Sequence, residues 1–202
     1  MQGNLTTLLV SGVTGVTAFY LAALTLVQYA SPNTLRARIR FLTAGSLIVV
    51  TVAILVSGVV QYLVWRADPL TDLLLPPHRP ASYFAAYLFM RLAAPYLISG
   101  VVGLLGWFAL ARLNALRGGA LAEDHEPALL FIGTFLSGYP GWIAYLPLLG
   151  GVYALILAAV TIRHGGGSRH SLERLWLPAA LLGILLANLV LARLAGWSAL
   201  KL

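Results

Sequence analysis

The sequence predicts an all-α fold, a polytopic transmembrane helix bundle, and three observations lead to this prediction. Of its 202 residues, 60% are hydrophobic and only 9% are charged, whereas about a quarter of the residues in a soluble domain are charged. The apolar residues form long unbroken runs, and a helix needs about 20 such residues to cross about 30 Å of hydrocarbon. These runs lack the short alternating segments of a membrane β-barrel. Helices remain, because lipid cannot hydrogen-bond to an exposed backbone.

Apolar blocks divide the chain into segments that we expect to lie in the membrane. Short loops connect them, so residues 1–202 are expected to form a single integral membrane domain. Residues 1–7 carry no positive charge, and the first block is therefore expected to remain as a span rather than to act as a cleaved signal. The blocks are Leu5 to Ala30, Phe41 to Trp65, Tyr83 to Ala111, Pro127 to Ile162, and Leu175 to Trp197.

The fourth block, Pro127 to Ile162, is too long for one crossing at about 1.5 Å per residue. Gly138-Tyr139-Pro140-Gly141 interrupts it with the strongest turn chemistry in the chain. We therefore expect a broken or re-entrant segment at Gly138–Gly141, as a hairpin or a re-entrant pair. The chain then has five to six membrane-crossing segments.

Arginines in two loops predict the orientation. Short cytoplasmic loops carry an excess of Lys and Arg, so both loops are expected on the cytoplasmic side, which requires the fourth block to cross twice or to turn back. The net charge of +7 is then a topology signal, and we expect no nucleic-acid partner. An Ala-, Leu-, Gly- and Arg-rich chain without cysteine suits a bacterial cytoplasmic membrane. The arginines are Arg36, Arg38 and Arg40 in one loop, and Arg163, Arg169 and Arg174 in the other.

Arg91 is the charged residue placed deepest in a predicted span. A lone cation there costs a few kcal/mol or more, so Arg91 requires a partner. Tyr83 and Tyr87 precede it at four-residue intervals on the same helix face, and Pro95 cannot donate a hydrogen bond to its carbonyl. This kinked polar stripe predicts a site for an anion, a quinone or a lipid headgroup, lined by Arg91, Tyr87 and Tyr83. The alternative is a structural pair with groups of a neighbouring helix or subunit.

Small residues at regular spacing predict faces where helices approach closely. The sequence leaves open whether these faces pack within the chain or form a dimer interface. Asn188, near the end of the last block, is expected to form a hydrogen bond across helices. The small residues are Gly100, Gly103 and Gly106 at three-residue steps, and Ala179, Gly183 and Ala187 at four-residue steps.

Acids and a histidine are concentrated in Glu123-Asp124-His125-Glu126-Pro127. Carboxylates and imidazole suit a metal site or a proton-handling cluster. They also suit a helix start, because acids complement the positive end of the helix dipole and proline is tolerated in the first turn. We favour the helix start and expect no metal site, since consecutive residues on a helix point in different directions.

One stretch is similar to a known family. The segment from Gly118 to Gly138 resembles the second half of type-4 prepilin peptidases, with Glu123 and Asp124 near the position of that family's glycine-flanked aspartate. The flanking glycines are absent here, and so is a matching aspartate in Ser31 to Arg40. The resemblance therefore does not assign the chain to that family.

Three classes of function remain compatible with these features. The favoured one is a non-catalytic membrane subunit of a larger complex, respiratory or photosynthetic, whose partners are membrane lipids and other membrane protein subunits. The predicted cofactor contact is limited to a quinone or a lipid. The first alternative is a small-molecule transporter, which the broken fourth block favours. The second is an intramembrane or lipid-modifying enzyme, which would have to use Asp72, Asp124 or His125.

Overall fold

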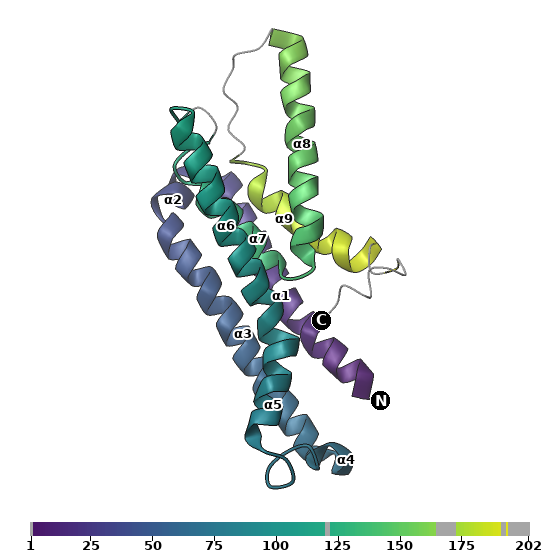
Figure 1. Ribbon diagram of the computed structural model, residues 1–202. Coiled ribbons are helices and arrows are strands. Elements are labelled where there is room, and N and C mark those ends of the chain that lie inside the picture. The colour runs from purple at the N-terminus through teal and green to yellow at the C-terminus, as the bar shows by residue number, and fades with distance from the viewer. Residues whose placement is uncertain (1, 120–121, 165–172, 191–192, 194–202) are drawn as a thin grey trace.

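The fold is all-helical over the residues that the structure describes (Figure 1). The structure is a computed structural model, and it describes residues 2–119, 122–164, 173–190 and 193. The helices are α1 (Gln2–Ala30), α2 (Pro32–Ala37), α3 (Ile39–Ala67), α4 (Pro69–Asp72), α5 (Ala81–Leu88), α6 (Ala94–Leu116), α7 (Glu126–Ser137), α8 (Gly141–His164) and α9 (Trp176–Leu185). Two π-helical turns complete it, at Phe89–Ala93 and Leu186–Val190.

Three helical segments are long and apolar enough to cross a membrane, which makes the chain a multi-pass membrane protein. They are Val10–Ala30, Ile39–Ala67 and Ala81–Leu116, with mean hydropathies of 1.7, 2.5 and 1.7. They confirm the first three predicted blocks. The later blocks form shorter apolar helices, Glu126–Ser137, Gly141–Ile156 and Trp176–Leu189. The end of the fifth block, from residue 194 onward, lies outside the described residues.

The third long helix changes its hydrogen-bonding pattern where the sequence predicts a kink. Phe89–Ala93 is a π-helical turn, and Pro95 follows in the first turn of α6. Proline has no N–H to donate to the carbonyl four residues earlier, and a single π-helical turn is a common form of such an irregularity. Arg91 lies inside this turn.

Helix α7 is the centre of the bundle, and all of its 12 residues are buried. It packs against α6, α9, α8, α3 and α1. A Cβ on Gly103 would lie 3.2 Å from the carbonyl oxygen of Phe131, so the backbones of α6 and α7 approach closely at this point. A Cβ on Gly100 or Gly106 would meet a side chain of α7, Phe135 at 3.4 Å or Leu130 at 3.1 Å. The spaced glycines of α6 therefore form its contact with α7.

The fourth predicted block is broken where the sequence indicated. Helix α7 ends at Ser137, and α8 begins at Gly141. Gly138 between them has φ +63°, which a glycine adopts without the strain that a Cβ would cause. The N–H of Tyr139 donates to the carbonyl of Pro95 at 3.1 Å. The turn is thus attached to α6 just beyond the π-helical turn that precedes it.

Helices α8 and α9 meet at the predicted small-residue face of α9. A Cβ on Gly183 would lie 2.9 Å from the Cα of Tyr145, and Ala179 and Ala187 are also buried. The side-chain amide of Asn188 donates to the carbonyl of Ile184, one turn earlier in the chain, at 2.9 Å. A hydrogen bond of Asn188 across helices stays a prediction.

Candidate functional site

Four ionisable side chains from three separate segments meet at the end of the bundle where α2 lies. Arg36 belongs to α2, Glu123 and His125 precede α7, and Glu173 precedes α9. We call these four residues the polar cluster. Most of the chain is apolar, so this concentration of charge is the most distinctive chemistry of the described residues.

Arg36 and Glu173 form the strongest contact of the polar cluster. The Nε of Arg36 donates to Oε1 of Glu173 at 2.8 Å, and one terminal nitrogen donates to Oε2. Two parallel bonds of this kind fix the carboxylate in position as well as neutralise it. The same terminal nitrogen lies 3.3 Å from Oε2 of Glu123. These hydrogen bonds from Arg36, aided by His125, lower the pKa of Glu173, whose side chain is only 7% exposed.

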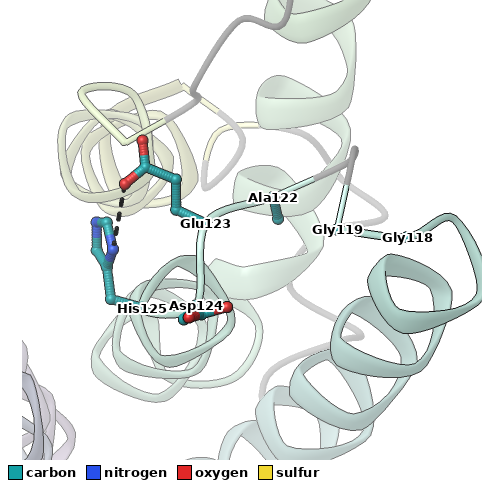
Figure 2. A pocket seen from close by; sticks show the side chains of 6 residues that line it. All are labelled: Gly118, Gly119, Ala122, Glu123, Asp124 and His125. Atoms are coloured by element: carbon teal, nitrogen blue, oxygen red, sulfur yellow. Dashed lines mark ion pairs between the residues drawn. The ribbon is translucent and has the colours of Figure 1, made fainter.

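His125 lies between the two glutamates of the polar cluster. Its Nε2 is 3.1 Å from Oε1 of Glu173, and its Nδ1 is 3.7 Å from Oε2 of Glu123. Figure 2 shows the imidazole and the Glu123 carboxylate turned toward each other, while Asp124 points away from them. The imidazole is therefore flanked by a carboxylate on either side.

The end of α1 holds the segment that carries Glu173. The side-chain amide of Gln28 donates to the carbonyl of Glu173, and the hydroxyl of Tyr29 donates to the carbonyl of Arg174 at 3.1 Å. These contacts join parts of the chain that are 145 residues apart. The loop after the first span and the segment before α9 therefore lie side by side, as the arginine pattern requires if they share one side of a membrane.

The loop between α6 and α7 forms an open pocket beside the polar cluster. Gly118, Gly119, Ala122, Glu123, Asp124 and His125 line it (Figure 2). The amide of Asn114 forms two hydrogen bonds to the backbone of Ala122, at 2.8 and 3.0 Å. These bonds fix the residue that immediately precedes Glu123. The carboxylate is thus presented at the pocket by a loop that is attached to α6.

Carboxylates outnumber guanidinium groups among the residues of the polar cluster and the buried Glu126. Glu126 is fully buried at the start of α7, and it interacts electrostatically with Arg36, as Glu123 and Glu173 do. Three carboxylates and one guanidinium leave two negative charges when the imidazole is neutral (three minus one). Removing uncompensated charge from water is costly, so this arrangement favours the binding of a proton or a cation.

The prediction for Glu123 to Pro127 is correct in one respect and wrong in another. Helix α7 begins at Glu126 with Pro127 in its first turn, so the helix start is confirmed. The expectation that neighbouring side chains diverge is wrong for Glu123 and His125. Both precede the helix, in an irregular segment, and helical geometry does not separate them. Together with Glu173 they offer donor atoms that all lie within 4.8 Å of one another.

Sequence reasoning missed the participation of Arg36 and Glu173. Glu173 is one of only three glutamates in the chain, and the other two are Glu123 and Glu126. The arginine pattern already placed the loops around residues 36 and 174 on one side of the membrane. The start of the fourth block is predicted on that same side. The two arginine loops and this start, taken together, would have indicated the polar cluster.

The residues predicted to line a site around Arg91 lie along α5 and the first π-helical turn. The ring of Tyr83 faces the guanidinium of Arg79, whose Cζ is 5.9 Å from the ring centroid. The ring of Tyr87 packs against Trp65 of α3, with 4.7 Å between centroids. The side chain of Arg91 is on the exposed surface of the bundle. A site for an anion, quinone or lipid at these residues stays a prediction.

No family model, no curated protein and no solved structure matches this chain. Its function is therefore inferred from the residues and their geometry.

Proposed function

We propose that this chain is a non-catalytic membrane subunit of a larger membrane protein complex, to which it contributes helices. The observation that carries the proposal is the unequal use of glycine in its membrane helices. Neighbouring helices of the same chain pack directly against some glycines. Other glycines lie on outer faces where no described residue covers them. In membranes, small residues let helix backbones approach one another, and helix interfaces are enriched in them.

Several glycines face neighbouring helices of the same chain and allow them to pack closely. Gly103 of α6 contacts α7, Gly133 of α7 contacts Tyr145 of α8, and Gly183 of α9 contacts the backbone of Tyr145. A Cβ at any of these positions would meet an atom at 3.2 Å or less. Each of these glycines is therefore required for close packing within the chain.

The outward glycines have no such role within the described part of the chain. Gly12 and Gly15 of α1 lie three residues apart, and a Cβ added to either would have no atom of that part within 4 Å. The same is true of Gly150 and Gly151 of α8. A glycine inside a helix costs about 1 kcal/mol relative to alanine. A partner helix that packs on these faces would offset that cost, which is why they support assembly with other subunits.

The placement of the chain in a membrane is part of the proposal. Helix α7 has 12 residues and would rise about 18 Å, short of the about 30 Å of hydrocarbon. It begins at the end of the bundle where α2 lies, and α8 runs back toward that end (Figure 1). This arrangement supports a re-entrant pair broken at Gly138–Gly141, in a bundle of five to six membrane-crossing segments, with the polar cluster on the cytoplasmic side of a bacterial membrane.

Lipids are the expected partners of the remaining outer surface. Large apolar side chains of the long helices are exposed along their length, as Phe41 and Phe108 illustrate, each more than 70% exposed. Exposed apolar side chains of this kind face hydrocarbon in a membrane protein. A quinone or lipid headgroup near Arg91 remains the ligand proposed for this surface.

A transporter is the second candidate, and the broken α7–α8 segment favours it. Transporters commonly bind their substrates at discontinuous helices near the middle of the membrane. Here the break is filled: Tyr96 of α6 lies 3.3 Å from the Cβ position of Gly138, and the Tyr139 N–H is bonded to the carbonyl of Pro95. The subunit proposal therefore accounts better for the packing around the break.

Native mass spectrometry of the protein, extracted gently from its own membrane, tests the proposal. A stoichiometric complex with one or more different membrane proteins is the expected result. A chain that is released alone under conditions that preserve known complexes of the same membrane contradicts it. A lone chain that carries a small organic molecule would instead support the transporter.

A further inference from the structure

We propose that the polar cluster binds one divalent transition-metal ion, with Glu123, His125 and Glu173 as its protein ligands. This site goes beyond the proposed function, because a metal ion here would link two segments of the fold whether or not the chain assembles with partners. The ligands come from two segments that are about fifty residues apart in the sequence. Their donor atoms all lie within 4.8 Å of one another.

The spacing of the donor atoms suits a shared ion. Zinc lies about 2.0–2.2 Å from imidazole nitrogen and carboxylate oxygen, which places two ligands of one ion about 2.8–3.6 Å apart for bond angles between 90° and the tetrahedral angle. The Nε2 of His125 and Oε1 of Glu173 are 3.1 Å apart. Glu123 is less buried, with a side chain that is 33% exposed, and rotation of its carboxylate would complete a three-residue site open to the pocket of Figure 2.

The contact between His125 and Glu173 is compatible with a shared ligand. The Nε2 of His125 is buried and lies 3.1 Å from Oε1 of Glu173, without the alignment of a regular hydrogen bond. The side chain of His125 is nine-tenths buried. A nitrogen that faces a carboxylate oxygen without a hydrogen bond is well placed to share a metal ion with it.

The charge of the site also favours a divalent cation. Glu123, Glu126 and Glu173 exceed Arg36 by two negative charges when His125 is neutral, and neutral imidazole is the form that binds metals. One divalent ion would cancel this excess.

Arg36 has a positioning role in this site. A carboxylate has about four lone-pair positions, so the two bonds from Arg36 leave the edge of Oε1 that faces His125 able to bind an ion. Ligand carboxylates in metal sites are commonly held by such outer hydrogen bonds. Arg36 thus orients Glu173 and does not need to leave when the ion binds.

The ligand set indicates which metal would bind. Imidazole suits zinc, iron, nickel and copper, whereas magnesium and calcium prefer sites made of oxygen alone. One nitrogen and two carboxylates therefore favour zinc, iron(II) or manganese(II) over magnesium. The bound ion would join the start of α7 to the segment before α9, beside the end of α1 that holds the same segment.

Calorimetric titration of the full chain with Zn²⁺, in detergent after treatment with a chelator, tests the site. We expect saturable binding of one ion per chain, with no comparable heat from Mg²⁺. His125→Gln and Glu123→Gln should each weaken binding at least about tenfold. Asp124→Asn is the matched control, because it removes an adjacent acid that is exposed and points away from the site, and it should retain the affinity of the unmodified chain.

Three outcomes would overturn the site. They are the absence of saturable binding, binding that both ligand variants leave unchanged, and zinc X-ray absorption spectra of the loaded protein without an imidazole ligand. Circular dichroism and gel filtration show whether each variant is folded, and Glu123→Gln decides the matter if His125→Gln unfolds, because Glu123 is the less buried ligand. The native mass of the assembly is measured separately, so failure of the metal site leaves the proposed function standing.

Discussion

Helices α6 and α1 both carry glycines at three-residue spacing, and they differ in what lies above those glycines. Gly100, Gly103 and Gly106 of α6 are covered by α7, whereas Gly12 and Gly15 of α1 have open space above them within the described part of the chain. The same sequence pattern thus forms an internal contact on one helix and an uncovered face on the other. A small-residue stripe therefore predicts close approach but not the identity of the approaching helix. It is also the basis for assigning the α1 face to a partner subunit.

A bulky side chain in the contact between α6 and α7 should lower the stability of the chain more than any other change considered below. Gly103→Leu would drive a side chain into the carbonyl of Phe131, and such overpacking costs about 1–3 kcal/mol or more. Thermal unfolding in detergent should therefore show a clearly lowered midpoint. Gly12→Leu is the matched control on α1 and should change the midpoint of the isolated chain little, since surface substitutions usually stay within about 0.5 kcal/mol. Equal losses in the two variants would remove the distinction between the faces.

The next effect concerns the polar cluster. Arg36→Met leaves the carboxylate of Glu173, 7% exposed, without its two bonds from the guanidinium. Breaking a buried pair costs about 3–5 kcal/mol, and the 41% exposure of Arg36 reduces the expected loss to about 2 kcal/mol. Chemical denaturation would measure it. Arg38→Met, which removes a nearby exposed arginine, should be close to neutral, and a similar loss in both variants would contradict the account.

The pH dependence of stability is expected to be smaller and to have a definite sign. Arg36 lowers the pKa of Glu173 in the folded chain relative to its ordinary value of 4.5. The stabilisation is therefore fully present above the ordinary carboxyl pKa and is lost as the pH falls below it through the folded pKa. Unfolding measured from pH 7 down to the acid range should show a loss that is reduced in Glu173→Gln. An identical acid loss in that variant would assign the effect to other groups.

Two substitutions on the outer face of α1 should have the smallest effect on stability and the largest effect on assembly. Gly12→Leu together with Gly15→Leu should leave the isolated chain folded, because no described atom lies within 4 Å of either Cβ position. The bulky side chains should nevertheless prevent a partner helix from approaching α1. Gentle extraction followed by native gel electrophoresis should show loss of the complex. Retention of an unchanged complex would exclude this face as the interface.

Much of the fold could be predicted from the sequence because its signals are local. Length and hydropathy identify the three long helices, the glycines and the proline of Gly138–Gly141 identify the break, and Pro127 marks the start of α7. The π-helical turn before Pro95 likewise follows from a missing N–H. Each of these features depends on residues within a few positions of one another.

The candidate site could not be predicted in full because it depends on distant contacts. Glu123 and Glu173 are about fifty residues apart, and only the packing of α7 beside α9 brings their segments together. Local reasoning placed Glu123 and His125 on a helix, where they would diverge. The partner of a polar side chain is a property of the tertiary fold.

Site-specific photo-crosslinking in the native membrane tests whether the outer face of α1 contacts a different membrane protein. Phe19 lies on the α1 face of Gly15, four residues farther along, and Phe108 of α6 is an exposed phenylalanine for comparison, at 78% and 71% exposure. Each would be replaced by the photoreactive analogue benzoylphenylalanine. We expect position 19 to form a discrete adduct with a different membrane protein and position 108 to react mainly with lipid. Lipid adducts alone at both positions, or adducts only with a second copy of this chain, would contradict the assignment of this chain as a subunit of a larger complex.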